Sequence, residues 1–322
     1  MSTMPRWGGR RVVVTGANGF LGFHLSRRLL DLGAAVTAVV RPGANLWRLT
    51  SIAGDLDLVS AELADLPRKE VLSRLGDPDV VYHLAAAGTN QSVHEPEVVL
   101  QGNVVGIRRV LEAVRVLGGP RVVAAGTAFE YGAGSRLRED APLRPLTVYA
   151  ASKAAAHLLA HAEARMAGLS LVTLRAFSVY GPAQSALFLI PHTILSALSG
   201  SQIAVSGASQ MRDYVFVNDA VDAFIKAADC GGDGEVYNIC SGIETSVRDV
   251  VTLVIEATKS GRAATFRDAV SGHHELAVCS GSAEKARAGL GWCATTTLAD
   301  GVGQTVSWFT QNAFLYERLA AQ

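Results

Sequence analysis

The stretch that most constrains this chain is residues 12–22, which read Val-Val-Val-Thr-Gly-Ala-Asn-Gly-Phe-Leu-Gly. A short β-branched run, typical of a buried parallel strand, leads into three glycines spaced three residues apart, and an amphipathic helical pattern follows. Gly16 permits a tight turn, Gly19 lets the backbone approach a pyrophosphate, and Gly22 lets the helix pack closely on the strand. The phosphate then meets free N–H groups at the positive end of the helix. Because glycine is common here, at 32 residues, a purely structural turn is the alternative.

The residues after this turn alternate between strand and helix patterns. A helix over about 20–32 and an apolar strand over 35–40 complete a βαβ unit, which favours dinucleotide binding over a structural turn. Further strands are predicted over 56–59, 79–84, 121–125 and 169–175, with helices over 98–117 and 149–167 and a loop over 132–145. This alternation predicts an α/β fold with a Rossmann-type, doubly wound parallel sheet.

The pattern loosens into shorter elements beyond residue 180. Helices are predicted over 191–199, 246–259 and 298–310, and strands over 202–205 and 235–239. We expect residues 1–175 and 213–240 to form the dinucleotide-binding domain, and 176–212 and 241–322 a smaller α/β substrate-binding lobe. Such a lobe sits over the carboxyl ends of the strands, where open α/β sheets bind their ligands.

Composition excludes several classes of partner. Lys+Arg and Asp+Glu are equal at 29 each, so no net charge favours nucleic acid or an anionic membrane. No apolar run approaches the length of a membrane span. The four cysteines show no C-x-x-C spacing, which favours a reduced, cytoplasmic protein.

A second informative stretch is Tyr149-Ala-Ala-Ser-Lys153. Residues four apart share a helix face, so the phenol and the ammonium point into the same space. A nearby positive charge stabilises the phenolate and lowers the pKa of Tyr149 toward the working range. Thr127, at the end of the preceding strand, can place a hydroxyl beside that phenol. These three side chains predict a proton-transfer site for an alcohol or ketone, whereas an ordinary helix pair is the alternative.

Eight motifs occur in one order along about 11–309. They are Gly16-x-x-Gly19-x-x-Gly22, His83-Leu84-Ala85-Ala86, Asn103-Val-Val-Gly106, Thr127-x-x-x-Tyr131-Gly132, Tyr149-x-x-x-Lys153, Val179-Tyr180-Gly181-Pro182, Arg212-Asp213-Tyr214-Val215-x-Val217-x-Asp219 and Leu290-Gly291-Trp292. In combination they resemble the extended short-chain dehydrogenase/reductases, specifically the branch of nucleotide-sugar epimerases, dehydratases and reductases.

This resemblance implies roles for individual residues. Tyr149 is then the general acid/base, Lys153 holds the nicotinamide ribose and tunes Tyr149, and Thr127 hydrogen-bonds the substrate oxygen. The implied substrate-binding residues are Thr127, Tyr149, Ser178 and Arg212. Besides the three glycines, the implied cofactor-binding residues are Asn18, Phe20, Leu21, Arg41, Glu62, Leu63, Leu84, Ala85, Ala86, Ala87, Asn103, Tyr149, Lys153 and Phe177.

One departure from the family concerns the cofactor. At the end of the second strand, where an acidic residue would hold the ribose 2′-hydroxyl of NAD, this sequence has Arg41. An arginine can pair with a 2′-phosphate, which favours NADP(H) over NAD. The alternative is that Arg41, followed by Pro42, is a solvated loop residue.

Other departures concern the substrate. The 4,6-dehydratases resemble one another in acidic residues one and two places after the catalytic Thr, and this sequence has Ala128 and Phe129 there. Glu130 comes one residue later, where a strand end turns the side chain to the other face. The family's Asn after the sixth strand is Ser178, and its arginine before the last small strand is absent from 268–282, where His273 and His274 occur instead. The sequence therefore does not identify which nucleotide the substrate carries.

No metal site is expected. His157 and His161 lie four residues apart on a predicted helix, but Leu158 stands where a zinc protease has Glu and no third ligand is evident. The predicted helices 98–117 and 149–167 resemble the pair that forms a four-helix bundle between two protomers in this family. A homodimer is the expectation, with a monomer as the alternative.

The leading hypothesis is NADP(H)-dependent reduction of a keto sugar attached to a nucleoside diphosphate, a 4-keto-6-deoxyhexose in the first instance. The close alternative is a nucleotide-sugar 4-epimerase, which uses the same residues with a retained cofactor. A 4,6-dehydratase is less favoured, as is a dinucleotide sensor without catalysis, because a sensor needs no proton-transfer site.

Overall fold

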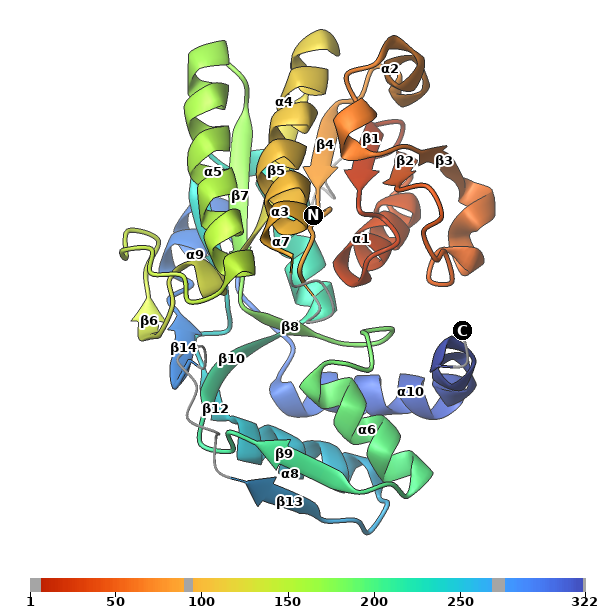
Figure 1. The fold of residues 1–322 in the computed structure, drawn as a ribbon, viewed down its shortest axis with the longest axis vertical. Coiled ribbons are helices and arrows are strands. Elements are labelled where there is room, and N and C mark those ends of the chain that lie inside the picture. Colours follow the sequence, from red (N-terminus) through yellow and green to blue (C-terminus); the bar gives the residue numbers. More distant parts are fainter. Residues whose placement is uncertain (1–6, 90–94, 268–275, 321–322) are drawn as a thin grey trace, which may run out of the picture.

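The computed structural model describes residues 7–89, 95–267 and 276–320, and it is built on one seven-stranded parallel sheet (Figure 1). The strand order is β3-β2-β1-β4-β5-β7-β11, with every neighbouring pair parallel. The strands are β1 (Arg11–Thr15), β2 (Ala35–Val40), β3 (Leu56–Ser60), β4 (Val80–His83), β5 (Arg121–Thr127), β7 (Leu171–Ala176) and β11 (Val236–Ile239). The chain reverses direction across the sheet between β1 and β4, the place where such sheets bind ligands. The predicted α/β class with a doubly wound parallel sheet is confirmed.

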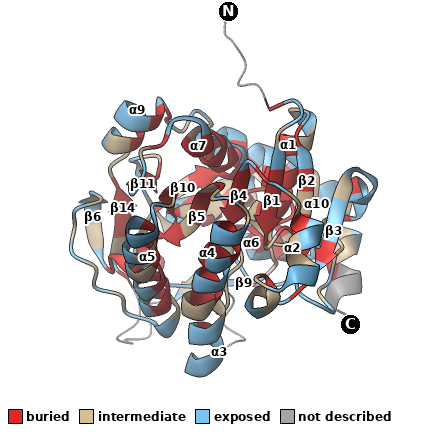
Figure 2. Ribbon diagram, turned by 90° about the horizontal axis from the view of Figure 1, so that it is seen from above, coloured by how far each residue is buried: buried red, intermediate tan, exposed pale blue. Residues whose placement is uncertain are grey.

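Helices cover both faces of this sheet (Figure 2). One face packs against α2 (Lys69–Leu75), α4 (Gly106–Val116) and α5 (Val148–Ala167), and the other against α1 (Phe20–Asp31) and α7 (Val217–Cys230). The near-continuous apolar strands follow from this two-sided burial.

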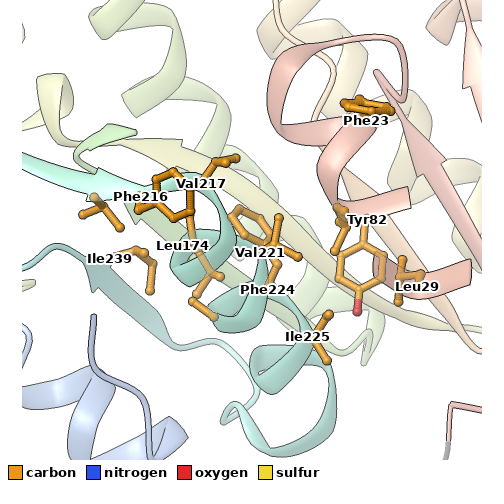
Figure 3. Packing of buried hydrophobic residues seen from close by; sticks show 14 of the residues in the cluster. Phe23, Leu29, Tyr82, Leu174, Phe216, Val217, Val221, Phe224, Ile225 and Ile239 are labelled. Atoms are coloured by element: carbon orange, nitrogen blue, oxygen red, sulfur yellow. The ribbon is translucent and has the colours of Figure 1, made fainter. Parts of the chain in front are cut away.

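Helix α7 supplies much of the core on its face. Figure 3 shows its side chains Val221, Phe224 and Ile225 turned toward the sheet. They share one buried cluster with Leu174 of β7 and Tyr82 of β4. Our sequence analysis assigned no helix to this segment.

A second group of elements lies beyond the carboxyl ends of the strands. Its mixed sheet has the order β12-β10-β14-β6, with β8 paired to β10, and β9 pairs with β13. These strands are β6 (Gly134–Leu137), β8 (Ser178–Tyr180), β9 (Ile203–Ser206), β10 (Met211–Phe216), β12 (Glu244–Ser246), β13 (Ala264–Arg267) and β14 (Val278–Gly281). The helices are α6 (Leu189–Ser199), α8 (Val247–Thr258) and α10 (Leu298–Ala320), whereas α9 (Glu284–Leu290) packs against α7 and β11 of the main sheet. Figure 1 places α6, α8 and α10 below the main sheet.

Two sequence-based boundaries were wrong. The helix predicted over 98–117 is interrupted, because α3 (Pro96–Leu100) and α4 flank a π-helical turn at Gln101–Val105. The loop predicted over 132–145 contains β6, which pairs with β14. A one-residue change in helical repeat and a strand paired with a distant segment both leave little trace in local periodicity.

Among the residues that the structure describes, no helix combines the length and the apolar character needed to cross a lipid bilayer.

Candidate functional site

The glycine turn joins β1 to α1 at the edge where the parallel strands end. Gly16 has a φ of +71°, and a Cβ there would lie 2.6 Å from the amide N of Ala85, in the loop after β4. A Cβ at Gly22 would overlap the backbone of Gly16 and come within 2.9 Å of Ala17 Cα. Gly16 therefore forms the tight turn, and Gly22 lies close to the backbone of that turn at Gly16 and Ala17.

The first turn of α1 presents the geometry of an anion cradle. Gly19 is its N-cap, and no side chain caps the helix there. A dinucleotide pyrophosphate fits this arrangement, because backbone N–H groups at a helix N-terminus favour negative charge. Asn18, Phe20 and Leu21 are half-buried in the same turn. Arg48 contacts this turn, because its Nη1 donates to Asn18 O at 3.3 Å.

Arg41 is exposed immediately after β2, at the same edge of the sheet as the glycine turn. This is where the sequence analysis placed the residue facing the adenosine ribose. Two further predicted cofactor residues follow β3, where Glu62 is exposed and Leu63 is half-buried against the face that carries α4.

The loop after β4 borders the glycine turn and contains the half-buried residues Leu84, Ala85, Ala86 and Ala87. Asn103, in the π-helical turn, fixes this loop. Its Oδ1 accepts from Ala87 N at 2.7 Å, and its Nδ2 donates to Ala87 O at 3.0 Å and to Ser152 Oγ at 2.8 Å. The amide of Asn103 therefore orients the loop backbone and connects it to α5.

The three predicted catalytic side chains come together beside this loop. Thr127 is the last residue of β5, and Tyr149 and Lys153 lie one turn apart at the start of α5. The start of α5 is set by Thr147, whose Oγ1 accepts from Ala150 N at 3.1 Å. The side chain of Thr127 lies near the phenol of Tyr149. The ammonium of Lys153 is buried one turn farther along.

Burial dominates the acid–base properties of this group. It raises the pKa of Tyr149 above the ordinary value, the charge of Glu130 raises it further, and the neighbouring Thr127 hydroxyl opposes both. Burial also lowers the pKa of Lys153 to about 8, against the opposing effect of Glu130. The expected lowering of the Tyr149 pKa by a neighbouring cation was wrong, because burial and the charge of Glu130 raise this pKa and only Thr127 opposes them.

Glu130 is a buried neighbour of Thr127 to which the sequence pattern assigned no role. It is fully buried behind Thr127, in the turn Ala128–Glu130 that follows β5. Its Oε1 accepts from Thr127 N at 2.8 Å, and its Oε2 accepts from His157 Nδ1 and Arg175 Nε, both at 2.9 Å. Burial alone would raise the pKa of Glu130, but His157 and then Arg175 and Thr127 lower it to about 2. Both carboxylate oxygens are therefore occupied by hydrogen bonds inside the protein.

One signal in the sequence could have found this cluster. Arg175 interrupts the apolar strand β7, and a charge in a buried strand needs a partner. Arg175 also donates from Nη1 to Tyr131 Oη at 2.8 Å, and that hydroxyl donates to Asn238 Oδ1 at 2.7 Å. The buried network therefore spans β5, β7 and β11.

The two histidines of α5 pack inside the protein. His157 is buried against Glu130, and its Nε2 lies 3.3 Å from Ala125 O. His161 Nε2 lies 3.0 Å from Thr173 Oγ1. In the described part of the chain, no three His, Cys, Asp or Glu side chains are grouped closely enough to hold a metal ion.

The predicted substrate-facing residues are spread along the second group of elements. Ser178 begins β8 and pairs in register with Tyr214. Arg212 lies on β10, where its Nη1 donates to Leu276 O at 2.7 Å. Phe177 is buried in a separate small cluster with Tyr131. His273 and His274 lie outside the described residues.

Comparisons with known proteins agree on one group. The chain matches the model of the NAD dependent epimerase/dehydratase family over residues 12–240. It is 32% identical over 314 residues to UDP-glucose 4-epimerase of Mycolicibacterium smegmatis, covering 93% of this chain and 98% of the relative. It is 31% identical over 326 residues to dTDP-glucose 4,6-dehydratase of Streptomyces griseus, covering 96% of each.

A solved structure extends the likeness to the fold. MoeE5 in complex with UDP-glucuronic acid and NAD matches with a TM-score of 0.83 at 32% identity, covering 94% of this chain and 99% of that one.

Proposed function

Because the chain belongs to the NAD-dependent epimerase/dehydratase family of enzymes, we propose that it transfers hydride reversibly at C4 of a nucleoside-diphosphate sugar and acts as a 4-epimerase. The observation that carries this proposal is that Thr127 at the end of β5 and Tyr149 and Lys153 at the start of α5 come together beside the glycine turn. A UDP-glucose 4-epimerase relative aligned over nearly the whole of both chains supports the same activity.

The residues divide the work between cofactor and sugar. A nicotinamide dinucleotide, when bound, supplies the hydride acceptor and donor, and the turn with Gly16, Gly19 and Gly22 cradles its pyrophosphate. Tyr149 moves a proton to and from the oxygen on C4. Thr127 orients that oxygen, and Lys153 holds the nicotinamide ribose. Ser178 and Arg212 contact the sugar nucleotide, for which a planar guanidinium is well suited.

Epimerisation requires both directions of this transfer at one carbon. Tyr149 must be in its phenolate form to accept the proton of the C4 hydroxyl, and loss of hydride from C4 to a bound oxidised dinucleotide would give a ketone. The keto sugar then turns over in the site, hydride returns to its opposite face, and Tyr149 gives the proton back. The product is the C4 epimer, and the cofactor ends in its starting redox state.

Net reduction of a keto sugar is the second candidate, and Arg41 is the observation that favours it. An exposed arginine at the end of β2 suits the 2′-phosphate of NADP(H), and NADPH suits net reduction. We place epimerisation ahead of this reductase hypothesis, which led our sequence analysis, because the relatives favour epimerisation and MoeE5 holds NAD. NADP(H) remains our proposal for the preferred cofactor of a reductase.

A 4,6-dehydratase is disfavoured despite the likeness to dTDP-glucose 4,6-dehydratase. Elimination needs an acid beside the substrate, and the two positions after Thr127 hold Ala128 and Phe129. The nearest carboxylate, Glu130, is fully buried and bonded to His157.

Two broader features belong to the same proposal. Residues 1–175 and 213–240 serve as the cofactor domain, and 176–212 and 241–322 as the substrate lobe, to which β6 and β10 add strands from the first set of residues. The protein acts as a cytoplasmic homodimer through α4 and α5, whose outer sides expose Val116, Leu158 and Met166. These apolar side chains support a helical interface, because exposed apolar patches of this kind favour association.

The test begins with the purified protein. Denaturation releases any retained dinucleotide, which is identified, and nicotinamide absorbance is then followed with NADH or NADPH against a panel of nucleoside-diphosphate sugars and their 4-keto-6-deoxy forms. Retained NAD with conversion of one sugar nucleotide to its C4 epimer, and no net cofactor turnover, is the expected result. Stoichiometric loss of NADPH with one keto sugar establishes the reductase instead.

A matched variant separates enzyme from sensor. Tyr149→Phe removes only the phenolic hydroxyl, so we expect it to abolish turnover while dinucleotide binding is kept. Unchanged cellular function of this variant would overturn both enzyme hypotheses in favour of a dinucleotide sensor.

A further inference from the structure

We propose that Glu130 is a positioning residue for the reaction, one whose buried carboxylate fixes the backbone of Thr127 and sets the pH range over which Tyr149 and Lys153 act. This inference rests on the catalytic roles proposed above for those three side chains. Glu130 itself touches neither substrate nor cofactor in this scheme.

Glu130 and Thr127 cap each other reciprocally at the end of β5. Glu130 Oε1 accepts from Thr127 N at 2.8 Å, while Thr127 Oγ1 accepts from Phe129 N at 3.4 Å. Together these bonds close a capping box around the turn Ala128–Glu130. The direction of the Thr127 hydroxyl therefore depends on the Glu130 carboxylate.

Close packing around Gly126 confines Glu130 and its partners. A Cβ on Gly126, the residue before Thr127, would lie 2.7 Å from His157 Cε1 and 3.0 Å from both Arg175 Cγ and Glu130 Oε1. Strand β5 therefore has a glycine at the position where Glu130, His157 and Arg175 pack against it. The carboxylate and its partners are held in place by close packing as well as by hydrogen bonds.

Several titratable and charged groups surround Glu130 and the reacting side chains. Arg175 of β7 bonds Glu130, Tyr131 and Glu139 follow in the turn and loop, and His83 of β4 faces Lys153 and His157. Helix α5 contributes four titratable groups at intervals of one turn, which are Tyr149, Lys153, His157 and His161.

Glu130 acts on the two reacting groups in the same direction. Its negative charge raises the pKa of Lys153, which keeps the ammonium charged, and raises the pKa of Tyr149, which keeps the phenol protonated. Removing the charge should lower both pKa values.

Two substitutions of Glu130 separate position from charge. Glu130→Gln removes the charge and keeps an oxygen that can accept from Thr127 N. We therefore expect both limbs of the pH–rate profile to move to lower pH, by about one unit for a neighbouring charge in this range. Glu130→Asp keeps the charge and shortens the reach to Thr127, so we expect a lower kcat with both limbs in place.

Glu139→Gln is the matched control. Glu139 is a half-buried carboxylate whose Oε1 accepts from Asn238 N at 2.8 Å, a bond that Gln can also accept. Its substitution should leave the limbs of the profile unmoved.

A readout that does not need turnover keeps this inference distinct from the proposed function. The phenol of Tyr149 is titrated by ultraviolet difference absorbance, taking Tyr149→Phe as the blank, with Glu130 or Gln at position 130. A lower midpoint in the Gln background supports the inference even for a protein with no sugar activity.

Several outcomes would overturn the inference. One is a folded Glu130→Gln protein whose limbs and phenol midpoint equal those of the wild type. If Glu130→Gln does not fold, Glu130→Asp decides the matter, because a displaced profile in that variant contradicts the assignment of the pH range to charge.

Discussion

Substituting Gly16 with alanine tests the close approach at the glycine turn. The φ of +71° costs an L residue roughly 1–2 kcal/mol. The added Cβ would lie 2.6 Å from Ala85 N and 2.7 Å from Ala85 Cα, so the backbone of the turn or of the loop after β4 must move by about 0.8 Å to reach an ordinary 3.4 Å contact. Overpacking of this kind costs about 1–3 kcal/mol. We expect Gly16→Ala to lower the free energy of unfolding by about 2–5 kcal/mol.

Two other glycines provide matched controls. Gly168, at the end of α5, has a φ of +65° and no atom within 4 Å of an added Cβ, so Gly168→Ala should cost only the conformational part, roughly 1–2 kcal/mol. Gly303 is exposed in α10 and equally uncrowded, so Gly303→Ala should stabilise by up to about 1 kcal/mol.

The assay combines denaturant unfolding with calorimetric titration of NAD and NADP. Because the turn moves, Gly16→Ala should also weaken dinucleotide binding at least tenfold, which corresponds to about 1.4 kcal/mol. Gly168→Ala and Gly303→Ala should bind like the wild type. Equal stability losses in Gly16→Ala and Gly168→Ala, together with unchanged binding, would refute the argument from close approach.

Three further predictions concern cofactor choice, acid stability and association. Arg41→Ser should reduce the affinity for NADP relative to NAD by roughly 10–100-fold, the value of one charge-assisted hydrogen bond, and competitive titration compares it with the exposed control Arg115→Ser. Burial lowers the pKa of His83 to about 3, so the unfolded chain binds an extra proton and stability falls as pH drops from about 6.5 to about 3. His83→Gln should flatten this slope by up to about 1.4 kcal/mol per pH unit, measured by denaturant unfolding across that range. Leu158→Glu should convert a dimer to monomers in sedimentation velocity, whereas Leu187→Glu, at an equally exposed apolar site outside α5, should not.

The sequence predicted the main sheet well because its strands and helices depend on local patterns. The β-branched run of β1, the glycine turn and the amphipathic α1 each leave a signature within about a dozen residues. Thr127, Tyr149 and Lys153 were found for the same reason, since two of them share a helix face and the third ends a strand.

What the sequence did not predict depends on contacts between distant segments. Glu130 and Arg175 are 45 positions apart, and only the fold of β5 against β7 brings them together. Helix α7 follows directly on β10, and its start at Val217 continues an apolar run that suits either element. The π-helical turn adds a change of helical repeat that hydrophobic periodicity does not resolve.

Helix α5 has a buried side that faces the site and an exposed side. One side carries Tyr149, Lys153 and His157 at intervals of one turn, and the other exposes Leu158 and Met166. Figure 2 shows that α5 has both buried and exposed parts. A rotation of α5 about its own axis would displace Tyr149, Lys153 and His157 together, while a contact on its exposed side would resist that rotation. Variants on the outer side of α5 are therefore expected to change turnover without touching substrate, and their kinetics should be compared at protein concentrations above and below the point of association.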